Sequence, residues 1–497
     1  MITEILNGLI NTLNVSVILA MFSGVILGIV IGALPGLSAT MGVALMLPLT
    51  FGMEPTVGML LLLGIYVAGI YAGSVSAVLL KTPGTAASAA TVEDGFALAQ
   101  QGKANQALNM SIYASVAGGL ISGIVLLLFA PQIAKVALEF GAPEYFSLAL
   151  FGLTIIASVS GKTIIKGLIA ACLGLLITTV GMDPINGQGR FLFGTTFLSS
   201  GIDLVPALIG LFAISEVFNQ IEQRTKSIAA KSTIDNSKFS IKDFLKHKWV
   251  VLKSSVIGVI VGAIPGTGGT ISAFISYNEA KRKSKTPEKF GNGSLEGIAA
   301  SESSNNGTTG ATLIPMMTLG IPGDVVTAVL LGGLMIQGLT PGPELFTTNK
   351  DLVYTIMIGF IIINIILFFM AKLAIPWFSK ITSIPSVILM PIILVLCLVG
   401  SFAVDNSLSS AGIAIFFGVI GYVLPKYGFP VTPMLIAIVL GPIAENSFRQ
   451  SLLLSDGSFL IFIQRPVSVL FLILGLISIL GPFLAKYFSK NKDNLKG

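Results

Sequence analysis

Apolar residues fill stretches of about twenty positions along most of this chain, which is the length of a helix that crosses a lipid bilayer. Clear examples are the stretches 15–34, 57–80, 352–370 and 467–484. With the shorter stretches included, we expect roughly 10 to 14 transmembrane or half-membrane helices. The pattern therefore predicts an all-α polytopic membrane protein.

Pro-Gly pairs interrupt the apolar pattern at four places. GALPG at 32–36 and GAIPG at 262–266 are nearly the same sequence, and each is followed by a second break, Pro83-Gly84 and Pro322-Gly323 respectively. Proline removes a backbone donor and glycine permits a sharp reversal, while lipid cannot satisfy the backbone groups that are freed. Breaks at corresponding places in two halves therefore predict the binding site of a transporter.

A polar, charged segment separates the two halves. We predict a first membrane repeat at 1–218, a cytoplasmic basic linker at 219–248, a second membrane repeat at 249–485 and a cytoplasmic basic tail at 486–497. Thirteen of the 29 Lys and Arg residues lie between Arg224 and Lys289. The positive-inside rule explains these basic segments better than nucleic-acid binding does. We therefore expect the protein to lie in a lipid bilayer and to bind no nucleic acid.

The basic residues also predict how the Pro-Gly segments enter the membrane. Lys and Arg flank the segment 254–277 on both sides, so it is expected to enter and return on one face as a re-entrant hairpin. No Lys or Arg precedes Lys81, as expected if the first copy approaches from the other face. The prediction is a pair of inverted-topology repeats with re-entrant Pro-Gly hairpins. The alternative for the first copy is that 15–34 is a complete span.

Composition supports the membrane class and narrows the chemistry. The chain is 54% hydrophobic and 10% charged, whereas a soluble domain is about a quarter charged. Its two cysteines, Cys172 and Cys397, lie in apolar stretches, and its single histidine, His247, lies among the linker lysines. Neither a metal spacing, a nucleophile–base pair nor a G-x-x-x-x-G-K-[ST] phosphate loop is visible. We therefore expect no enzymatic activity and no cofactor.

The half-helices that begin after the breaks are candidate anion sites. Their free N–H groups carry partial positive charge, and small and hydroxylated residues follow each break. Lys81 is either a cationic clamp for a substrate carboxylate or a lysine that reaches the membrane interface. The predicted substrate-binding residues are Pro35, Gly36, Ser38, Thr40, Lys81, Pro83, Gly84, Thr85, Pro265, Gly266, Thr267, Thr270, Pro322 and Gly323.

An unusually polar stretch at 296–310 leads into the fourth break. Asparagine amides, hydroxyls and exposed carbonyls are ligands that suit a hard cation such as Na⁺. The alternative is a cytoplasmic loop that continues from the basic segment, which is an equal candidate for Glu296 and Glu302. Between the late apolar stretches, Glu445 and Arg449 are interpreted as a structural ion pair or cap. The predicted cation-coupling residues are Ser303, Asn305, Asn306 and Asp324.

These stretches together resemble the large membrane subunit of the tripartite tricarboxylate transporters, the TctA family. The resemblance extends over roughly residues 17–450. One departure is Ala300-Ser-Glu-Ser-Ser, where the family is alanine-rich with a proline. The similar segments are GALPGL at 32–37, KTPGT at 81–85, TVEDG at 91–95, GAIPG at 262–266, EGIAASESSNN at 296–306, TLGIPG at 318–323 and LGPIAEN at 440–446.

The resemblance implies an importer of citrate and other carboxylates in the bacterial cytoplasmic membrane, driven by an ion gradient. It also implies two partners, an extracytoplasmic solute-binding protein and a small membrane subunit. The alternatives are a stand-alone ion-coupled carboxylate carrier without a binding protein, an intramembrane enzyme and a passive channel. One linker histidine and few acids within the apolar stretches favour Na⁺ over H⁺ as the coupling ion.

Overall fold

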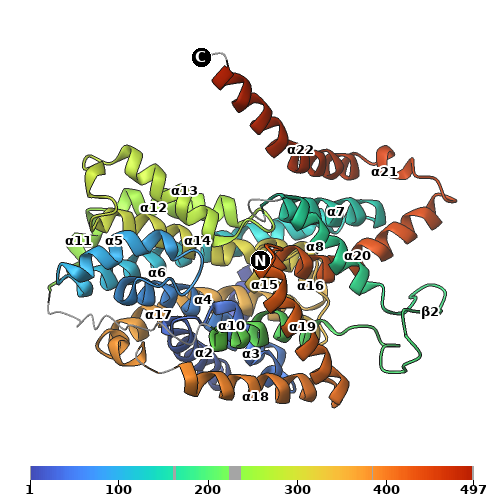
Figure 1. Cartoon of the computed structure of the whole chain (residues 1–497), viewed down its shortest axis with the longest axis horizontal. Coiled ribbons are helices and arrows are strands. Elements are labelled where there is room, and N and C mark those ends of the chain that lie inside the picture. Colours follow the sequence, from blue (N-terminus) through green and yellow to red (C-terminus); the bar gives the residue numbers. More distant parts are fainter. Residues whose placement is uncertain (1, 160–163, 223–236, 383, 385, 495–497) are drawn as a thin grey trace.

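The structure, a computed structural model, describes residues 2–159, 164–222, 237–382, 384 and 386–494 (Figure 1). Within these ranges eight helices are long and apolar enough to cross a membrane, and four shorter apolar helices accompany them. The described part contains two strands, and each is two residues long. The prediction of an all-α polytopic membrane protein is confirmed.

In the described part of the first half there are twelve helical segments and the two strands. The segment after α10 includes residues 223–236 of the predicted basic linker, which lie outside the described residues. The elements are α1 (Ile2–Thr12), α2 (Val15–Ala33), α3 (Ala39–Met46), η1 (Leu47–Thr50), α4 (Pro55–Leu80), α5 (Ala89–Gln100), α6 (Ala104–Ala137), α7 (Ala142–Val159), α8 (Ile164–Thr178), β1 (Gly181–Met182), β2 (Gly189–Arg190), α9 (Leu204–Leu208), the π-helical η2 (Ile209–Ile214) and α10 (Ser215–Glu222).

The second half begins at α11, and its last helix extends into the predicted basic tail. The elements are α11 (Ile241–Leu245), α12 (Lys248–Gly262), α13 (Gly268–Lys283), η3 (Pro287–Lys289), α14 (Leu295–Leu319), α15 (Val325–Ile336), α16 (Leu345–Thr348), α17 (Lys350–Ile381), α18 (Ser386–Asp405), α19 (Leu408–Lys426), α20 (Val431–Leu454), α21 (Ile461–Gln464) and α22 (Pro466–Asn494).

Glycines allow two pairs of helices to pack with their backbones in contact. Gly28 of α2 lies against Ile65 of α4, and Gly32 lies against Gly69, so α2 and α4 run parallel. A methyl group on Gly28 would lie 2.7 Å from the Ile65 carbonyl oxygen, which excludes a larger residue there. The same arrangement joins α12 to α14 through Gly258 with Ser304 and Gly262 with Thr308.

After each Pro-Gly pair of these two segments the chain turns back. Gly42 of α3 lies against Ile65, which is nearer the start of α4 than Gly69 is, so α3 runs opposite to α4. In the second half Gly269 lies against Thr308, and Tyr277 lies against Gly297 near the start of α14. The helix pairs α2–α3 and α12–α13 are therefore helical hairpins whose tips are the Pro-Gly turns.

The two long helices α6 and α17 each cross over to the other half. Helix α6 packs against α14 and α12, whereas α17 packs against α4 and α2. In Figure 1 helices α5, α6 and α11 to α13 lie on one side of the molecule, and α7, α8, α20 and β2 lie on the other. The two halves are therefore packed together through these long helices, with the breaks of the second half at Pro265 and Pro322-Gly323 buried.

Candidate substrate and ion site

The two breaks of the second half are joined by a backbone hydrogen bond. The Gly266 N–H, at the tip of the α12–α13 hairpin, donates to the Gly323 carbonyl at 2.8 Å. Gly266 has a φ of 80°, a left-handed conformation that glycine adopts without strain. Gly268, which begins α13, lies against the side chain of Asp324. Pro265, Pro322 and Gly323 are buried around this junction.

The two breaks of the first half are close but joined differently. The Gly84 N–H donates to the Gly73 carbonyl of α4 at 3.1 Å, and a methyl on Gly84 would lie 2.8 Å from the Gly32 carbonyl oxygen. Gly36, with a φ of 83°, lies against the Gln220 side chain of α10. Gln220 in turn donates to Glu216 at 2.8 Å. The tip of the first hairpin therefore contacts α10, whereas the tip of the second hairpin contacts the second break of the same half, at Pro322-Gly323.

Each second break ends one helix, and the same pattern of reciprocal bonds precedes or begins the next. Helices α4 and α14 end in left-handed residues, Lys81 with φ 58° and Gly320 with φ 70°. After the first of them, Thr85 and Ser88 are bonded reciprocally in the turn before α5, since each backbone N–H donates to the other's hydroxyl. After the second, Asp324 and Thr327 cap α15 reciprocally. The two reciprocally bonded pairs are 239 residues apart, as are the two left-handed residues.

Tyr66 links the first half to the fourth break. Its hydroxyl, in the middle of α4, donates to a carboxylate oxygen of Asp324 at 2.9 Å and lies 3.1 Å from the Thr312 hydroxyl. Asp324 is half-buried, and its other oxygen accepts the Thr327 N–H at 2.7 Å. The negative charge of Asp324 is thus held at the junction of α4, α14 and α15.

Asn305 is a buried amide without a hydrogen-bond partner. Its side chain lies in the middle of α14 and is 1% exposed, and neither its amide nitrogen nor its amide oxygen is bonded within the described residues. The amide oxygen lies against Gly269 at the start of α13, and Ala87, which follows the second break, approaches the same glycine. Asn305 therefore brings donor and acceptor capacity to the point where three of the four breaks meet.

The other predicted cation-coupling residues of α14 have different surroundings. Ser303 donates to the Ala299 carbonyl of its own helix at 2.7 Å, and its backbone faces Gly118 of α6. Asn306 donates to the Glu302 carbonyl at 3.1 Å, and its amide oxygen has no partner in the described part. The predicted alternative of a cytoplasmic loop at 296–310 is wrong, because this stretch is helical and forms the buried first part of α14.

The predicted hydroxyl and lysine residues lie near the breaks, and they differ in their hydrogen bonds and exposure. Ser38 accepts the Met41 N–H and caps α3, and Thr267 donates to the Val261 carbonyl of α12 and to the Ile264 carbonyl just after it. Thr40 and Thr270 are half-buried at the starts of α3 and α13, and Pro35 is half-buried beside them. Lys81 and Pro83 are exposed, and the Lys81 ammonium lies 5.6 Å from the centre of the Phe96 ring.

Two buried carboxylates were not among the predicted site residues. Glu302 is fully buried and accepts hydroxyl hydrogens from Thr91 of α5 and Ser115 of α6. Asp94 is also fully buried and accepts the N–H groups of Gly291, Gly293 and Ser294 together with the Tyr277 hydroxyl. Asp94 thus fixes the entry to α14, whereas Glu302 joins α14 to the first half through neutral donors.

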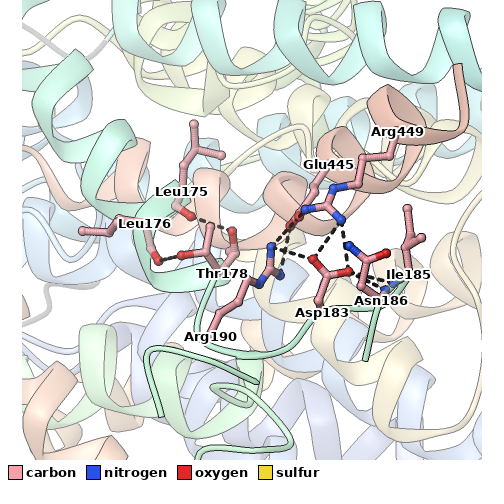
Figure 2. A network of polar contacts seen from close by, with 10 residues as sticks. Leu175, Leu176, Thr178, Asp183, Ile185, Asn186, Arg190, Glu445 and Arg449 are labelled. Carbon is pink, nitrogen blue, oxygen red and sulfur yellow. Dashed lines mark hydrogen bonds and ion pairs between the residues drawn. The ribbon is translucent and has the colours of Figure 1, made fainter. Parts of the chain in front are cut away.

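A network of four charges fastens the β1–β2 segment to α20 (Figure 2). Arg190 pairs with Glu445 at 2.6 Å, and Arg449 pairs with Asp183 at 2.8 Å and with Glu445 at 3.0 Å. The interpretation of Glu445 and Arg449 as a structural ion pair is confirmed. A cavity of about 240 Å³ borders Glu445 between α7, α8 and α20, and its lining includes none of the residues of the four breaks.

Paired interrupted helices around buried polar groups in a multi-pass membrane protein are typical of transporters. The chain belongs to the tripartite tricarboxylate transporter TctA family, whose model matches residues 18–436. The resemblance found in the sequence is thereby confirmed.

Two relatives from Agrobacterium vitis align over long stretches. The "Uncharacterized 52.8 kDa protein in TAR-I ttuC' 3'region" is 35% identical over 469 residues, which are 94% of this chain and 93% of the relative. The "Uncharacterized protein in TAR-II ttuC' 3'region" is 34% identical over 233 residues, which are 47% of this chain and 96% of the relative. No solved structure matches the chain.

Proposed function

We propose that this chain is the large permease subunit of a binding-protein-dependent secondary active transporter. It imports tricarboxylates or related organic anions across the bacterial cytoplasmic membrane, coupled to Na⁺. The observation that carries the proposal is the meeting of the Pro-Gly breaks around the unpartnered amide of Asn305. An unsatisfied buried amide is costly unless a ligand completes its bonds, so this position in the interior is a functional one.

The two halves are inverted-topology repeats, with the α2–α3 hairpin entering from outside and the α12–α13 hairpin from the cytoplasm. Equal glycine contacts of α2 with α4 and of α12 with α14 support this, as do the matching ends of α4 and α14. The charge pattern supports the orientation, because Lys281, Arg282 and Lys283 close α13. The repeats of the first half and the second half correspond to residues 1–218 and 249–485.

The substrate binds as an anion at the starts of the short helices. Helix α13 begins with Gly268 and Gly269, which lie next to Asp324 and Asn305 respectively. Backbone N–H groups at a helix start favour a carboxylate, and glycines let it approach the backbone closely. The Asn305 amide nitrogen adds a donor. Lys81 is exposed beside Phe96, where it attracts anions toward the site without bonding to a carboxylate there.

Sodium binds beside the substrate, where acceptor oxygens gather. The amide oxygen of Asn305 has no partner in the described residues, and Asp324 supplies a negative charge at the same junction. Oxygen ligands of this kind suit a hard cation, and a cation also compensates the charge of an anionic substrate. Binding of each therefore strengthens binding of the other, which is the basis of coupling.

The family name supports partners, since a tripartite transporter has three components. The partners are a soluble extracytoplasmic solute-binding protein and a small membrane subunit. The binding protein captures the organic anion and delivers it to the permease.

The experiment that tests the proposal is uptake into proteoliposomes. The permease and the small membrane subunit are reconstituted together, and the binding protein encoded beside them is added outside with radiolabelled citrate or another carboxylate. An inward Na⁺ gradient should drive accumulation, and a pH gradient of equal size without Na⁺ should not. Uptake that needs no binding protein would favour the stand-alone carrier, and uptake that is independent of both gradients would contradict secondary transport.

A further inference from the structure

The segment 179–203, which connects α8 to α9 and contains β1 and β2, projects from the body of the molecule. In Figure 1 the part around β2 extends from the side opposite α5 and α11, and no helix covers it. We call this segment the β1–β2 finger. It has no role in the site at the Pro-Gly breaks, so its shape needs another explanation.

The finger is held in a fixed position at its base. Asp183 accepts the N–H groups of Ile185 and Asn186, each at 2.9 Å, which closes the turn between the strands. These two backbone donors, together with Arg449, lower the pKa of Asp183 to about 2. Arg190 and Arg449 then tie the turn to Glu445 of α20, as Figure 2 shows. A loop that only connected two helices would not need four charges to fix it.

The fixed finger presents aromatic side chains to its surroundings. Phe193 is 81% exposed, Phe191 is 52% exposed and Phe197 is 48% exposed. Phe191 and Phe193 both have left-handed backbone conformations, with φ of 52° and 48°. Such conformations are unfavourable for bulky residues and persist where the surrounding structure imposes them, often at functional sites. Exposed, preorganised aromatic residues are typical of the centres of protein interfaces.

The finger lies on the membrane face opposite to the basic linker. The helix formed by Leu204–Glu222 is 19 residues long and apolar enough to cross the bilayer. It separates the finger at 179–203 from the linker at 219–248. Since the basic linker is cytoplasmic in the proposed function, the finger faces the extracytoplasmic side.

The charges around the finger favour a basic partner. Arg190 of the finger and Arg449 of α20 pair with Asp183 and Glu445, so that network is neutral. Asp203 at the end of the finger lies beside Asp405, and neither acid is in an ion pair among the described residues. The base of the finger therefore keeps an excess of negative charge, which attracts a surface rich in Lys and Arg.

We propose that the β1–β2 finger is the docking site of the soluble substrate-binding protein, which receives Phe191 and Phe193 in an apolar pocket with a basic rim. The proposal rests on the proposed function, because it assigns a surface to one of the three components. It does not involve the Pro-Gly breaks. Docking at this end places the released anion on the extracytoplasmic side of the permease.

The test measures uptake as a function of the concentration of binding protein, in proteoliposomes that contain the permease and the small subunit. Phe193→Asn removes the aromatic side chain but keeps a residue that tolerates the left-handed backbone. It should raise the half-saturating concentration of the binding protein by about tenfold or more, with the maximal rate retained. Phe193→Tyr keeps an aromatic ring, so the half-saturating concentration of the binding protein should stay at the value of the unaltered permease. Trp377→Asn, which removes an exposed aromatic side chain on α17, should also leave this concentration unchanged.

Cross-linking identifies what the finger touches. With p-benzoylphenylalanine in place of Phe193, light should join the permease to the added binding protein, and unlabelled binding protein should compete. Adducts with lipid or with the small subunit instead would overturn the assignment, as would an unchanged half-saturating concentration in Phe193→Asn. If the unaltered complex fails to take up the carboxylate, the proposed function fails and the docking assignment falls with it. If the unaltered complex transports normally, the Phe193 result alone decides the docking site.

Discussion

Tyr66 and Asn305 occupy equivalent positions, each fifteen residues before the left-handed residue that ends its helix. The longer Tyr66 reaches the fourth break and donates to Asp324. The shorter Asn305 faces the start of α13 and keeps both amide atoms free of partners in the described part. The same position thus stabilises a junction in one half and leaves an unbonded amide in the other.

Asn305→Leu should weaken the coupling to Na⁺. The variant loses the amide oxygen while keeping a side chain of similar size, so the Na⁺ concentration for half-maximal uptake should rise about tenfold or more, or transport should stop. The measurement is uptake at a series of Na⁺ concentrations. Asn109→Leu is the matched control, because that amide lies in α6 and already bonds to Asn105. An unchanged Na⁺ response in Asn305→Leu would remove this residue from the site.

Asp203 should make stability depend on pH. Burial, and then the neighbouring carboxylate of Asp405, raise its pKa from 3.8 to about 6. The folded protein therefore holds a proton that the unfolded chain releases, and stability falls as the pH rises from about 4 to about 6. Asp203→Asn should remove this loss, so that the melting temperatures in detergent at pH 5 and pH 8 come closer together. An unchanged difference between the two temperatures would contradict the raised pKa of Asp203.

At the scale of elements, the sequence predicted the positions of the turns better than the burial of the helices. Proline and glycine break a helix locally, so the tips at Pro35-Gly36 and Pro265-Gly266 were visible without any tertiary information. The surroundings of α14 were not visible. Its stretch 296–310 is polar enough to pass for a loop, yet the close glycine contacts with α12 and α6 bury it completely. Hydropathy depends only on the residue type, whereas the burial of this stretch depends on how closely the neighbouring helix backbones pack against it.

The hairpin glycines should separate transport from folding. Gly266→Leu places a side chain on a left-handed residue at the tip and disturbs the bond to Gly323, so uptake should be lost while membrane insertion remains. Gly258→Leu instead forces α12 away from the Ser304 carbonyl, and overpacking of this kind costs about 1–3 kcal/mol, so folded yield should fall. The measurements are uptake and monodisperse yield after purification. Normal uptake by well-inserted Gly266→Leu would count heavily against a site at the tip.

At the scale of the molecule, the two halves are joined through contacts between distant residues. Asp94 binds the segment before α14, nearly two hundred positions later, and Tyr66 binds Asp324. Such pairs leave no periodic signal in a single sequence, so the order of the breaks was predictable but their meeting point was not. Membership of the TctA family, in contrast, was predictable because it depends on local segments in the correct order.

The orientation of the molecule can be tested by labelling. In a variant without Cys172 and Cys397, a cysteine at Gln188 in the finger should react with an impermeant thiol reagent in intact cells. A cysteine at Lys285, beyond α13, should react only after the cells are opened, because the proposed orientation places the basic end of the α12–α13 hairpin in the cytoplasm. Labelling of Lys285→Cys in intact cells would make the segment a plain crossing and end the inverted-repeat account.

The most direct test of the site is protection of the second hairpin tip. Thr267 follows Pro265-Gly266, and a single cysteine at this position should react slowly with a small thiol reagent in the reconstituted permease. Substrate carboxylate and Na⁺ added together should slow the reaction further, while either alone should do so weakly, because each strengthens the binding of the other. A labelling rate that carboxylate and Na⁺ leave unchanged would contradict a substrate and ion site at the Pro-Gly breaks.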